Sequence, residues 1–461
     1  MVTVHAVLFK RDTRAVIGWV GLAWLAPIAG PLGYYMFGIN RIQRKAVALR
    51  IRESHRWEPK ITLSDEDRVR MEEIDYKYPS LVGLARLGYE LTDRHLVPGN
   101  RIAALINGDQ AFPAMLQAID AAEKTISLQS YIFDSDEVGE RFRQALVRAK
   151  ERGVEIRVLI DDVGSTYSRP TMVRLLRRSG IRVAAFLPTF LPRVAAYANL
   201  RNHRKILVVD GRVAFTGGTN IRVGHWQALK PAYPIECIHF RVEGPVVLQL
   251  QEAFAIDWAF TTEESLRGDG WFPPLTRVGK TWARGIPDGP DEDFEKITDA
   301  LTGAICCASR SIRIVTPYFL PHAALTQALN VAAMRGVKVD IVLPGVNNLP
   351  YVQWAATAQY WQLLEKGCRI YHSPPPFDHS KIMVVDGIWS LIGSSNWDPR
   401  SLRLNFEYNI ECYDTELAQQ LIRICDQKMA EATPVTLADV NGRSLPVQLR
   451  DGLCRLLTPY L

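Results

Sequence analysis

The strongest constraint on the fold is an internal duplication that begins near residue 100. The segment AEKTISLQSYIF at 122–133 corresponds to ASRSIRIVTPYF at 308–319, and RGVEIRVLID at 152–161 corresponds to RGVKVDIVLP at 335–344. In the second pair, a glycine of the kind that ends helices stands directly before an apolar run that predicts a strand. A repeat on this scale indicates two similar structural units.

Each unit reads as strand, helix, strand, helix, strand, followed by a hairpin. Strands that alternate with helices predict the α/β class, here two repeats that each form a mostly parallel mixed sheet flanked by helices, packed about a pseudo-twofold axis. The expected divisions are an N-terminal membrane segment (1–40), a tether (41–100), a first domain (101–260), a linker (261–293), a second domain (294–432) and a C-terminal tail (433–461). In the tail, the helically spaced leucines are expected to pack in a core: Leu449, Leu453, Leu456 and Leu457.

The segment Ala15–Phe37 carries no charged side chain and has about the length that one membrane span requires. The basic residues that follow it are more numerous than those before it, which predicts that the rest of the chain is cytoplasmic. These residues are Arg41, Arg44, Lys45, Arg50 and Arg52. Pro27 and Pro31 leave two alternatives open, a kinked span or a re-entrant hairpin. A cleaved signal peptide is not favoured, because no small-residue cleavage site is evident.

Each unit contains a histidine and a lysine two residues apart, just before the apolar strand that opens its hairpin. NHRKILVVDG occupies 202–211 and DHSKIMVVDG occupies 378–387. Because side chains alternate along a strand, His203 and Lys205 share one face, and His379 and Lys381 do the same in the second copy. All four are candidate catalytic residues.

An aspartate follows each histidine by seven residues and stands directly before a glycine. We include Asp210 and Asp386 among the site candidates, but expect them to shape the strand end and turn rather than to carry protons. A two-residue Asp-Gly turn would pair Val209 with Arg212. The same turn in the second unit would pair Val385 with Ile388. This register returns TGGTN (216–220) and IGSSN (392–396) to the histidine end, which makes four residues candidates for substrate binding: Gly218, Asn220, Ser394 and Asn396.

These residue types fit phosphoryl transfer. One histidine can attack phosphorus while the other protonates the leaving oxygen, and lysine and asparagine side chains can hold the phosphate oxygens. The lysines supply positive charge and would repel a metal ion, so neither a metal nor a cofactor is predicted. A nucleophilic histidine needs an acceptor on its other ring nitrogen, and Glu236 and Glu407 are the candidates. A single copy of the motif is more often structural, but two copies with the same downstream Gly-x-x-Asn favour catalysis.

With its doubled HxKxxxxD pattern, the chain resembles the phospholipase D superfamily, and within it the bacterial cardiolipin synthases. LAPIAGPLGYYMFGIN at 25–40, GSSNWDPRSLRLNFE at 393–407 and the closing LLTPYL extend the resemblance along the chain. The resemblance implies that phosphatidylglycerol forms a phosphatidyl-histidine, releases glycerol, and is then attacked by a second phosphatidylglycerol to give cardiolipin. It also implies that His203 is the nucleophile and His379 the acid and then the base. Two departures are RVGHW at 222–226, where similar synthases have an acidic stretch, and Glu236 in place of aspartate.

The alternatives are a phospholipase D-type hydrolase, a nuclease, or a membrane scaffold with a relic site. The net charge of +6 suits an anionic surface, but no dense Lys/Arg stripe interleaved with aromatics predicts nucleic-acid binding. The expected partners are phosphatidylglycerol and the membrane, and the expected location is the bacterial inner membrane with the catalytic body on the cytoplasmic side. Seven cysteines without a CxxC pair indicate reduced thiols. The oligomeric state is left open.

Overall fold

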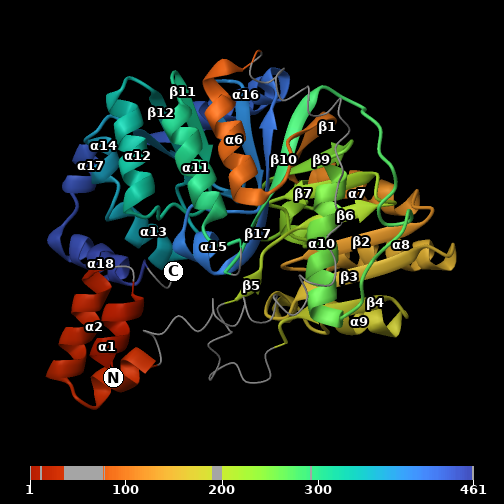
Figure 1. Ribbon diagram of the computed structural model, residues 1–461, viewed down its shortest axis with the longest axis horizontal. Coiled ribbons are helices and arrows are strands. Elements are labelled where there is room, and N and C mark those ends of the chain that lie inside the picture. Colours follow the sequence, from red (N-terminus) through yellow and green to blue (C-terminus); the bar gives the residue numbers. More distant parts are fainter. Residues whose placement is uncertain are drawn as a thin grey trace.

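The computed structural model describes residues 2–10, 13–35, 76, 78–188, 200–290 and 293–458. Two α/β halves share one sheet, with helices on both faces (Figure 1). The strands of the first half are β1 (Val97–Ile106), β2 (Thr125–Ser130), β3 (Glu155–Asp161), β4 (Arg182–Phe186), β5 (Arg201–Asn202), β6 (Ile206–Val209), β7 (Val213–Gly217), β8 (Ile235–Glu236) and β9 (Ile238–Glu243). Those of the second half are β10 (Thr281–Asp288), β11 (Ser311–Val315), β12 (Lys338–Pro344), β13 (Arg369–Ser373), β14 (Phe377–Asp378), β15 (Ile382–Val385), β16 (Trp389–Gly393), β17 (Asn405–Tyr413) and β18 (Thr433–Val435).

The helices of the body cover this sheet. They are α6 (Val82–Thr92), α7 (Asn107–Asp120), α8 (Glu137–Glu151), α9 (Met172–Arg178), α10 (Val247–Thr262), α11 (Lys296–Cys307), α12 (Ala323–Met334), α13 (Pro350–Thr357), α14 (Trp361–Leu364), α15 (Pro399–Arg403), α16 (Thr415–Glu431), α17 (Leu437–Asn441) and α18 (Leu445–Leu456).

The strand order reveals the duplication directly. Outward from the centre, the order is β1-β9-β7-β6-β2-β3-β4 on one side and β10-β17-β16-β15-β11-β12-β13 on the other. Corresponding strands therefore occupy corresponding places. Strands β2, β3 and β4 are parallel, as are β11, β12 and β13, while the central pairs are antiparallel. The predicted two-repeat α/β fold with a mixed sheet is confirmed, but the sheet is not mostly parallel. In each half the pairs β2-β3 and β3-β4, or β11-β12 and β12-β13, are parallel, and the pairs from the centre out to β2 or β11 are antiparallel because the motif strand and its hairpin partner lie between them.

Both motif strands are buried on both faces, which explains why their sequences are continuous apolar runs. In β6, Ile206 and Val208 belong to a core that draws residues from both halves, while Leu207 and Val209 belong to the core of the first half alone. In β15, Ile382 and Val384 belong to the shared core, while Met383 and Val385 belong to the core of the second half. The strands that carry the histidines thus lie where the two halves pack together.

The hairpin register differs by one residue from the prediction. Val209 pairs with Val213 rather than with Arg212, and Val385 pairs with Trp389 rather than with Ile388. Asp210 and the glycine after it both have positive φ, and the Arg212 N–H closes the turn on the Val209 carbonyl. Each turn therefore holds one more residue than a simple two-residue connection, as at a β-bulge.

The motif aspartates lie at the opposite ends of β6 and β15 from the histidines. The carboxylate of Asp210 accepts hydrogen bonds from the backbone N–H groups of residues 123–125. Asp386 accepts from the N–H groups of residues 309–311 and from the Ser309 hydroxyl. Each aspartate thus ties its turn to the start of the neighbouring strand, β2 or β11.

Replacing Asp386 with asparagine is expected to lower the free energy of unfolding by about 1–3 kcal/mol, because an amide cannot replace all these charge-assisted acceptor contacts. Burial opposes ionisation of Asp386, but its hydrogen bonds prevail and lower the carboxyl pKa. Its contribution is therefore present above the usual carboxyl pKa of about 4 and is lost as pH falls through the lowered value. Denaturant unfolding of both proteins across pH measures this. Asp426→Asn, at a half-exposed surface pair, is the control, and an equal effect of the two changes would contradict the prediction.

The predicted linker contains more than a connection. Within 261–293, β10 is buried along its whole length and joins the halves by pairing with both β1 and β17. Its inclusion in the central sheet means that neither half presents an open edge at the junction. The exact domain limits stay a prediction.

The N-terminal segment forms three short helices, α1 (Val2–Phe9), α2 (Thr13–Leu25) and α3 (Ala29–Gly33). The chain turns back on itself after α2. The Tyr34 ring centroid then lies 5.3 Å from that of Trp19, and Gly30 lies so close to α2 that a Cβ there would meet the Leu22 carbonyl oxygen at 2.4 Å. Among the described residues, no helix is long and apolar enough to cross a membrane. Phe37 and the basic residues at 41–52 lie outside the described residues.

The tail also differs from the prediction. Leu449, Leu453, Leu456 and Leu457 are exposed on α18 and just after it, and do not pack in a core. The helical spacing was identified correctly, but the body of the protein contacts the other side of this helix.

Candidate active site

The two motif histidines meet where the halves join. His203 stands before β6 and His379 before β15, and their ring centroids lie 6.4 Å apart at 87°. The backbone of each histidine is held by the opposite half. The backbone N–H of His203 donates to the Phe406 carbonyl at 2.9 Å, and the backbone N–H of His379 donates to the Glu236 carbonyl at 2.7 Å. Short parallel pairings of β5 with β17 and of β14 with β8 continue these contacts. The structure thus brings both copies of the motif into one site.

The two lysines are arranged in the same way in both halves. Lys205 Nζ donates to the His203 carbonyl at 2.7 Å, and Lys381 Nζ donates to the His379 carbonyl at 2.6 Å. Both are buried, which lowers the pKa of Lys205 to about 7 and that of Lys381 to about 8. An anion bound between the halves would favour the charged form of both lysines.

A cavity of about 480 Å³ opens onto both histidines. This volume lies in the range of small-molecule sites. Asn220 and Asn396 line it from equivalent positions, and Arg222 and Arg400 add two guanidinium groups. The described residues hold no cluster of metal-ligating side chains. Arg201 lines the cavity as well and Asp398 is the acidic residue of the lining, so positive charge is in excess and suits a phosphate group.

Glu407 fixes the orientation of His203. Its carboxylate lies 2.9 and 3.1 Å from His203 Nδ1, and the hydroxyls of Ser394 and Ser401 also donate to it. Burial raises the pKa of Glu407, but His203, Lys205 and these hydrogen bonds more than offset it, so the pKa is lowered and the carboxylate is ionised. Burial lowers the pKa of His203 to about 4. A neutral imidazole beside an ionised acceptor carries its proton on Nδ1, which leaves Nε2 as the nucleophilic nitrogen.

His379 lacks such a carboxylate, contrary to the prediction for Glu236. Its Nδ1 lies 3.0 Å from the Gly218 carbonyl, and the Glu236 side chain pairs with Lys428 at 3.1 Å. Burial, followed by the charge of Lys381, lowers the pKa of His379 well below its usual range. The two histidines therefore have different surroundings.

The sheet register identifies what replaces the carboxylate. Gly217 pairs with His239 and Gly393 pairs with Asn409, so Cys237 occupies the place that Glu407 has in the other half. The Cys237 thiol lies 3.3 Å from the His379 carbonyl oxygen. The sequence pattern missed this because Glu236 is the adjacent residue, and one step along a strand turns a side chain to the other face.

The substrate-binding candidates are also brought to the site. Asn220 Oδ1 accepts from the Ile132 N–H at 3.2 Å, and the buried Asn396 Oδ1 has no hydrogen-bond partner among the described residues. The Ser394 hydroxyl contacts Glu407. At Gly218 a Cβ would meet Cys237 Sγ at 2.7 Å, so only glycine fits.

A third histidine, which the motif did not reveal, lines the same cavity. The His225 ring centroid lies 6.2 Å from that of His379, its side chain is buried, and its Nδ1 has no partner among the described residues. The only signal in the sequence was the unusual RVGHW stretch. Tyr131 and Tyr318, which end the repeated strand segments, lie beside His203 and His379.

Sulfate binding should weaken as pH rises through about 7 and 8. Lys205 and Lys381 lose their charge over this range. Deprotonation of each lysine should lower the affinity for sulfate about tenfold per pH unit above the pKa of that lysine. The binding should take up protons, because the anion restores the charged lysines. Calorimetry in buffers of different ionisation enthalpy measures both quantities. Lys205→Met should flatten the profile, and an affinity independent of pH would contradict the prediction.

Comparison with known proteins gives a consistent result. The family model for the cardiolipin synthase phospholipase D-like domain matches residues 115–258 and 301–429, which include both motifs. The cardiolipin synthase of Geobacillus kaustophilus is 32% identical over 98% of this chain and 90% of its own length. The major cardiolipin synthase of Bacillus subtilis is 30% identical over 99% of this chain and 96% of its own length.

A solved structure resembles the fold. The crystal structure of phosphatidylserine synthase from Haemophilus influenzae matches 82% of this chain and 100% of that chain, with a TM-score of 0.62. The sequences are 14% identical, so this likeness concerns the fold alone.

Proposed function

The chain belongs to the family of phospholipase D-like cardiolipin synthases, and we propose from this that it transfers a phosphatidyl group between two phosphatidylglycerol molecules, making cardiolipin and releasing glycerol. The observation that carries the proposal is the pair of motif histidines 6.4 Å apart in one cationic cavity. Nucleophile and acid can thus act on opposite sides of one phosphorus.

In the first step, His203 Nε2 attacks phosphorus and the bond from phosphorus to the glycerol oxygen breaks. The proton for this oxygen comes from His379, which releases glycerol and leaves a phosphatidyl-histidine. The negative charge of the bound phosphodiester offsets the repulsion that Lys381 exerts on a protonated His379. Lys205 and Lys381 balance the charge that builds on the phosphate oxygens.

In the second step, a hydroxyl of another phosphatidylglycerol gives its proton to His379 and attacks phosphorus. The bond to His203 breaks and cardiolipin leaves. The different surroundings of the histidines support this assignment. A phosphorylated imidazole that keeps its Nδ1 proton is cationic, so the carboxylate of Glu407 stabilises it, whereas His379 must exchange its proton easily.

We also propose that the enzyme works at the inner membrane of a bacterial cell, with the body on the cytoplasmic side. Exposed apolar side chains of the N-terminal segment support a membrane location, among them Trp24 and Leu25 of α2 and Ile28 of the turn that follows.

The function is tested with the full chain in detergent micelles that contain phosphatidylglycerol as the only lipid. Cardiolipin and glycerol should appear in equal amounts. Phosphatidic acid as the sole lipid product would establish a hydrolase and overturn the proposal. A second assay with added phosphatidylethanolamine shows which lipid serves as acceptor, and EDTA should leave the rate unchanged.

A further inference from the structure

Helix α18 presents an apolar stripe to the outside. Leu445, Leu449, Leu453 and Leu456 are 68%, 59%, 64% and 73% exposed. These positions recur every three or four residues and so form one face. The buried Asp451 and the half-buried Cys454 lie on the other side, toward the body. Single exposed leucines are ordinary in soluble proteins, but a continuous row of four on one helix marks a contact surface.

Basic side chains border this stripe. Arg450 and Arg455 are exposed on the two flanks of the leucine face. The Arg450 guanidinium donates to the Asp451 carboxylate at 2.7 Å and lies 4.1 Å from the ring of Trp354 on α13. A leucine face flanked by arginines is the pattern of a helix that lies in a bilayer interface, with the arginines at the level of anionic headgroups.

The position of α18 connects the stripe to the catalytic cavity. Helix α18 packs on α13, and Tyr351 and Val352 of α13 line the cavity. Figure 1 draws α18 at the same lower-left corner as the N-terminal helices, which expose apolar side chains of their own. Tyr351 is exposed, so this part of the cavity lies at the protein surface, and a bilayer bound at α18 would lie beside it.

We propose that the leucine face of α18 docks on the surface of a bilayer rich in anionic phospholipid and holds the cavity entrance against it. The choice of a bilayer as the partner rests on the proposed function, because a phosphatidyl substrate is delivered from a membrane. The leucines enter the interface, and Arg455 contacts the headgroup phosphates.

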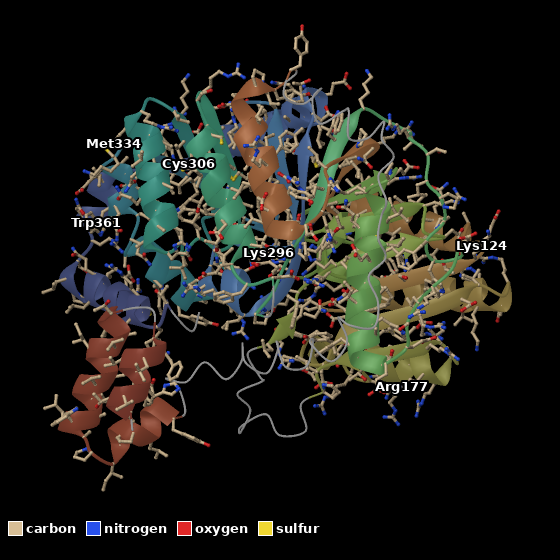
Figure 2. All side chains as sticks on the ribbon, viewed as in Figure 1. Lys124, Arg177, Lys296, Cys306, Met334 and Trp361 are labelled. Atoms are coloured by element: carbon tan, nitrogen blue, oxygen red, sulfur yellow. The ribbon has the colours of Figure 1, made fainter. Side chains whose placement is uncertain are left out.

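Hydrogen exchange of the full chain tests the docking directly. Vesicles of phosphatidylglycerol and phosphatidylcholine should slow amide exchange in α18 at least tenfold, and vesicles of phosphatidylcholine alone should do so less. Helix α12, whose exposed Met334 lies at the upper left in Figure 2, is the internal control and should not change. Unchanged exchange in α18 would overturn the proposal. If amide exchange in α18 slows without vesicles when the protein concentration is raised, the proposal is also overturned, because a second copy of the chain would then cover the stripe.

A double variant, Leu449→Asp with Leu453→Asp, measures the consequence for turnover. It should lose at least tenfold in rate on phosphatidylglycerol vesicles and keep its rate on dihexanoyl phosphatidylglycerol dissolved as monomers. The matched control is Val331→Asp with Met334→Asp, at exposed apolar positions of α12. Equal rates on vesicles for both double variants would overturn the role of the stripe. Slowed exchange in α18 without cardiolipin from either substrate would instead refute the proposed function and keep the docking surface.

Discussion

Replacing His203 with alanine is expected to abolish formation of the covalent intermediate from every donor, whereas replacing His379 is expected to block this first step only for donors whose leaving group needs a proton. Without the His203 imidazole no covalent intermediate forms, and the rate should fall by more than about 10⁴-fold. Loss of the acid at His379 should cost about 10²–10⁴-fold with phosphatidylglycerol. With phosphatidyl-p-nitrophenol, whose leaving group departs as a stable anion, His379→Ala should release nitrophenol in a first turnover at nearly the normal rate.

The measurement is a rapid-mixing assay of nitrophenol release, with a parallel search for lipid bound covalently to the protein. His372→Ala removes a histidine of β13 that does not line the cavity, and it serves as the control. If phosphatidyl-p-nitrophenol restores the first turnover of His203→Ala and not that of His379→Ala, then His379 is the nucleophile and His203 the acid. Substantial turnover of phosphatidylglycerol by either variant would refute the two-histidine mechanism.

Replacing Glu407 with glutamine is expected to reduce turnover by about 10³-fold. The glutamine amide can donate to His203 Nδ1, which favours the proton on Nε2 and removes the lone pair that attacks phosphorus. The change also removes the negative charge that stabilises the phosphorylated, cationic ring. Glu407 is thus a positioning residue that acts through His203.

The matched control is Glu236→Gln, which changes the glutamate that pairs with Lys428 and does not orient His379. It should alter the rate by less than about threefold, as is usual for partly exposed ion pairs. A pH profile separates positioning from folding. In the Glu407→Gln variant the negative charge that raises the pKa of His203 is gone, and burial then lowers this pKa further. The acidic limb of the Glu407→Gln profile should therefore move to lower pH. A large loss in Glu236→Gln, or an unshifted profile in Glu407→Gln, would contradict this role.

Much of the framework could be predicted because it depends on local patterns. The apolar runs before Asp210 and Asp386 are strands buried on both faces, and such strands are recognisable from four consecutive apolar residues. The helices and strands of the repeat also follow from periodicity and helix-ending glycines. The hairpin register was wrong by one residue because the φ values of Asp210 and Asp386 depend on the contacts that their carboxylates make with residues far away in the chain.

The N-terminal and C-terminal segments show a different limit of prediction. For Ala15–Phe37 the sequence left a kinked span and a re-entrant hairpin open, and the described part of this segment turns back on itself after Leu25. On α18 the helical spacing of leucines was correct, yet spacing alone does not say which side of a helix meets the body. That choice depends on where α13 lies.

The sequence by itself determined the duplication, the paired His-Lys motifs and the kind of chemistry they suit, because these depend on residue type and on spacing along one strand. Only the tertiary structure decided which acceptor each histidine receives. Glu407 reaches His203 from the opposite half, while the equivalent place beside His379 holds Cys237. Such contacts join residues more than a hundred positions apart, and a shift of one residue along β8 and β9 would turn Glu236 rather than Cys237 toward the site. The packing of the halves therefore makes two similar motifs chemically different.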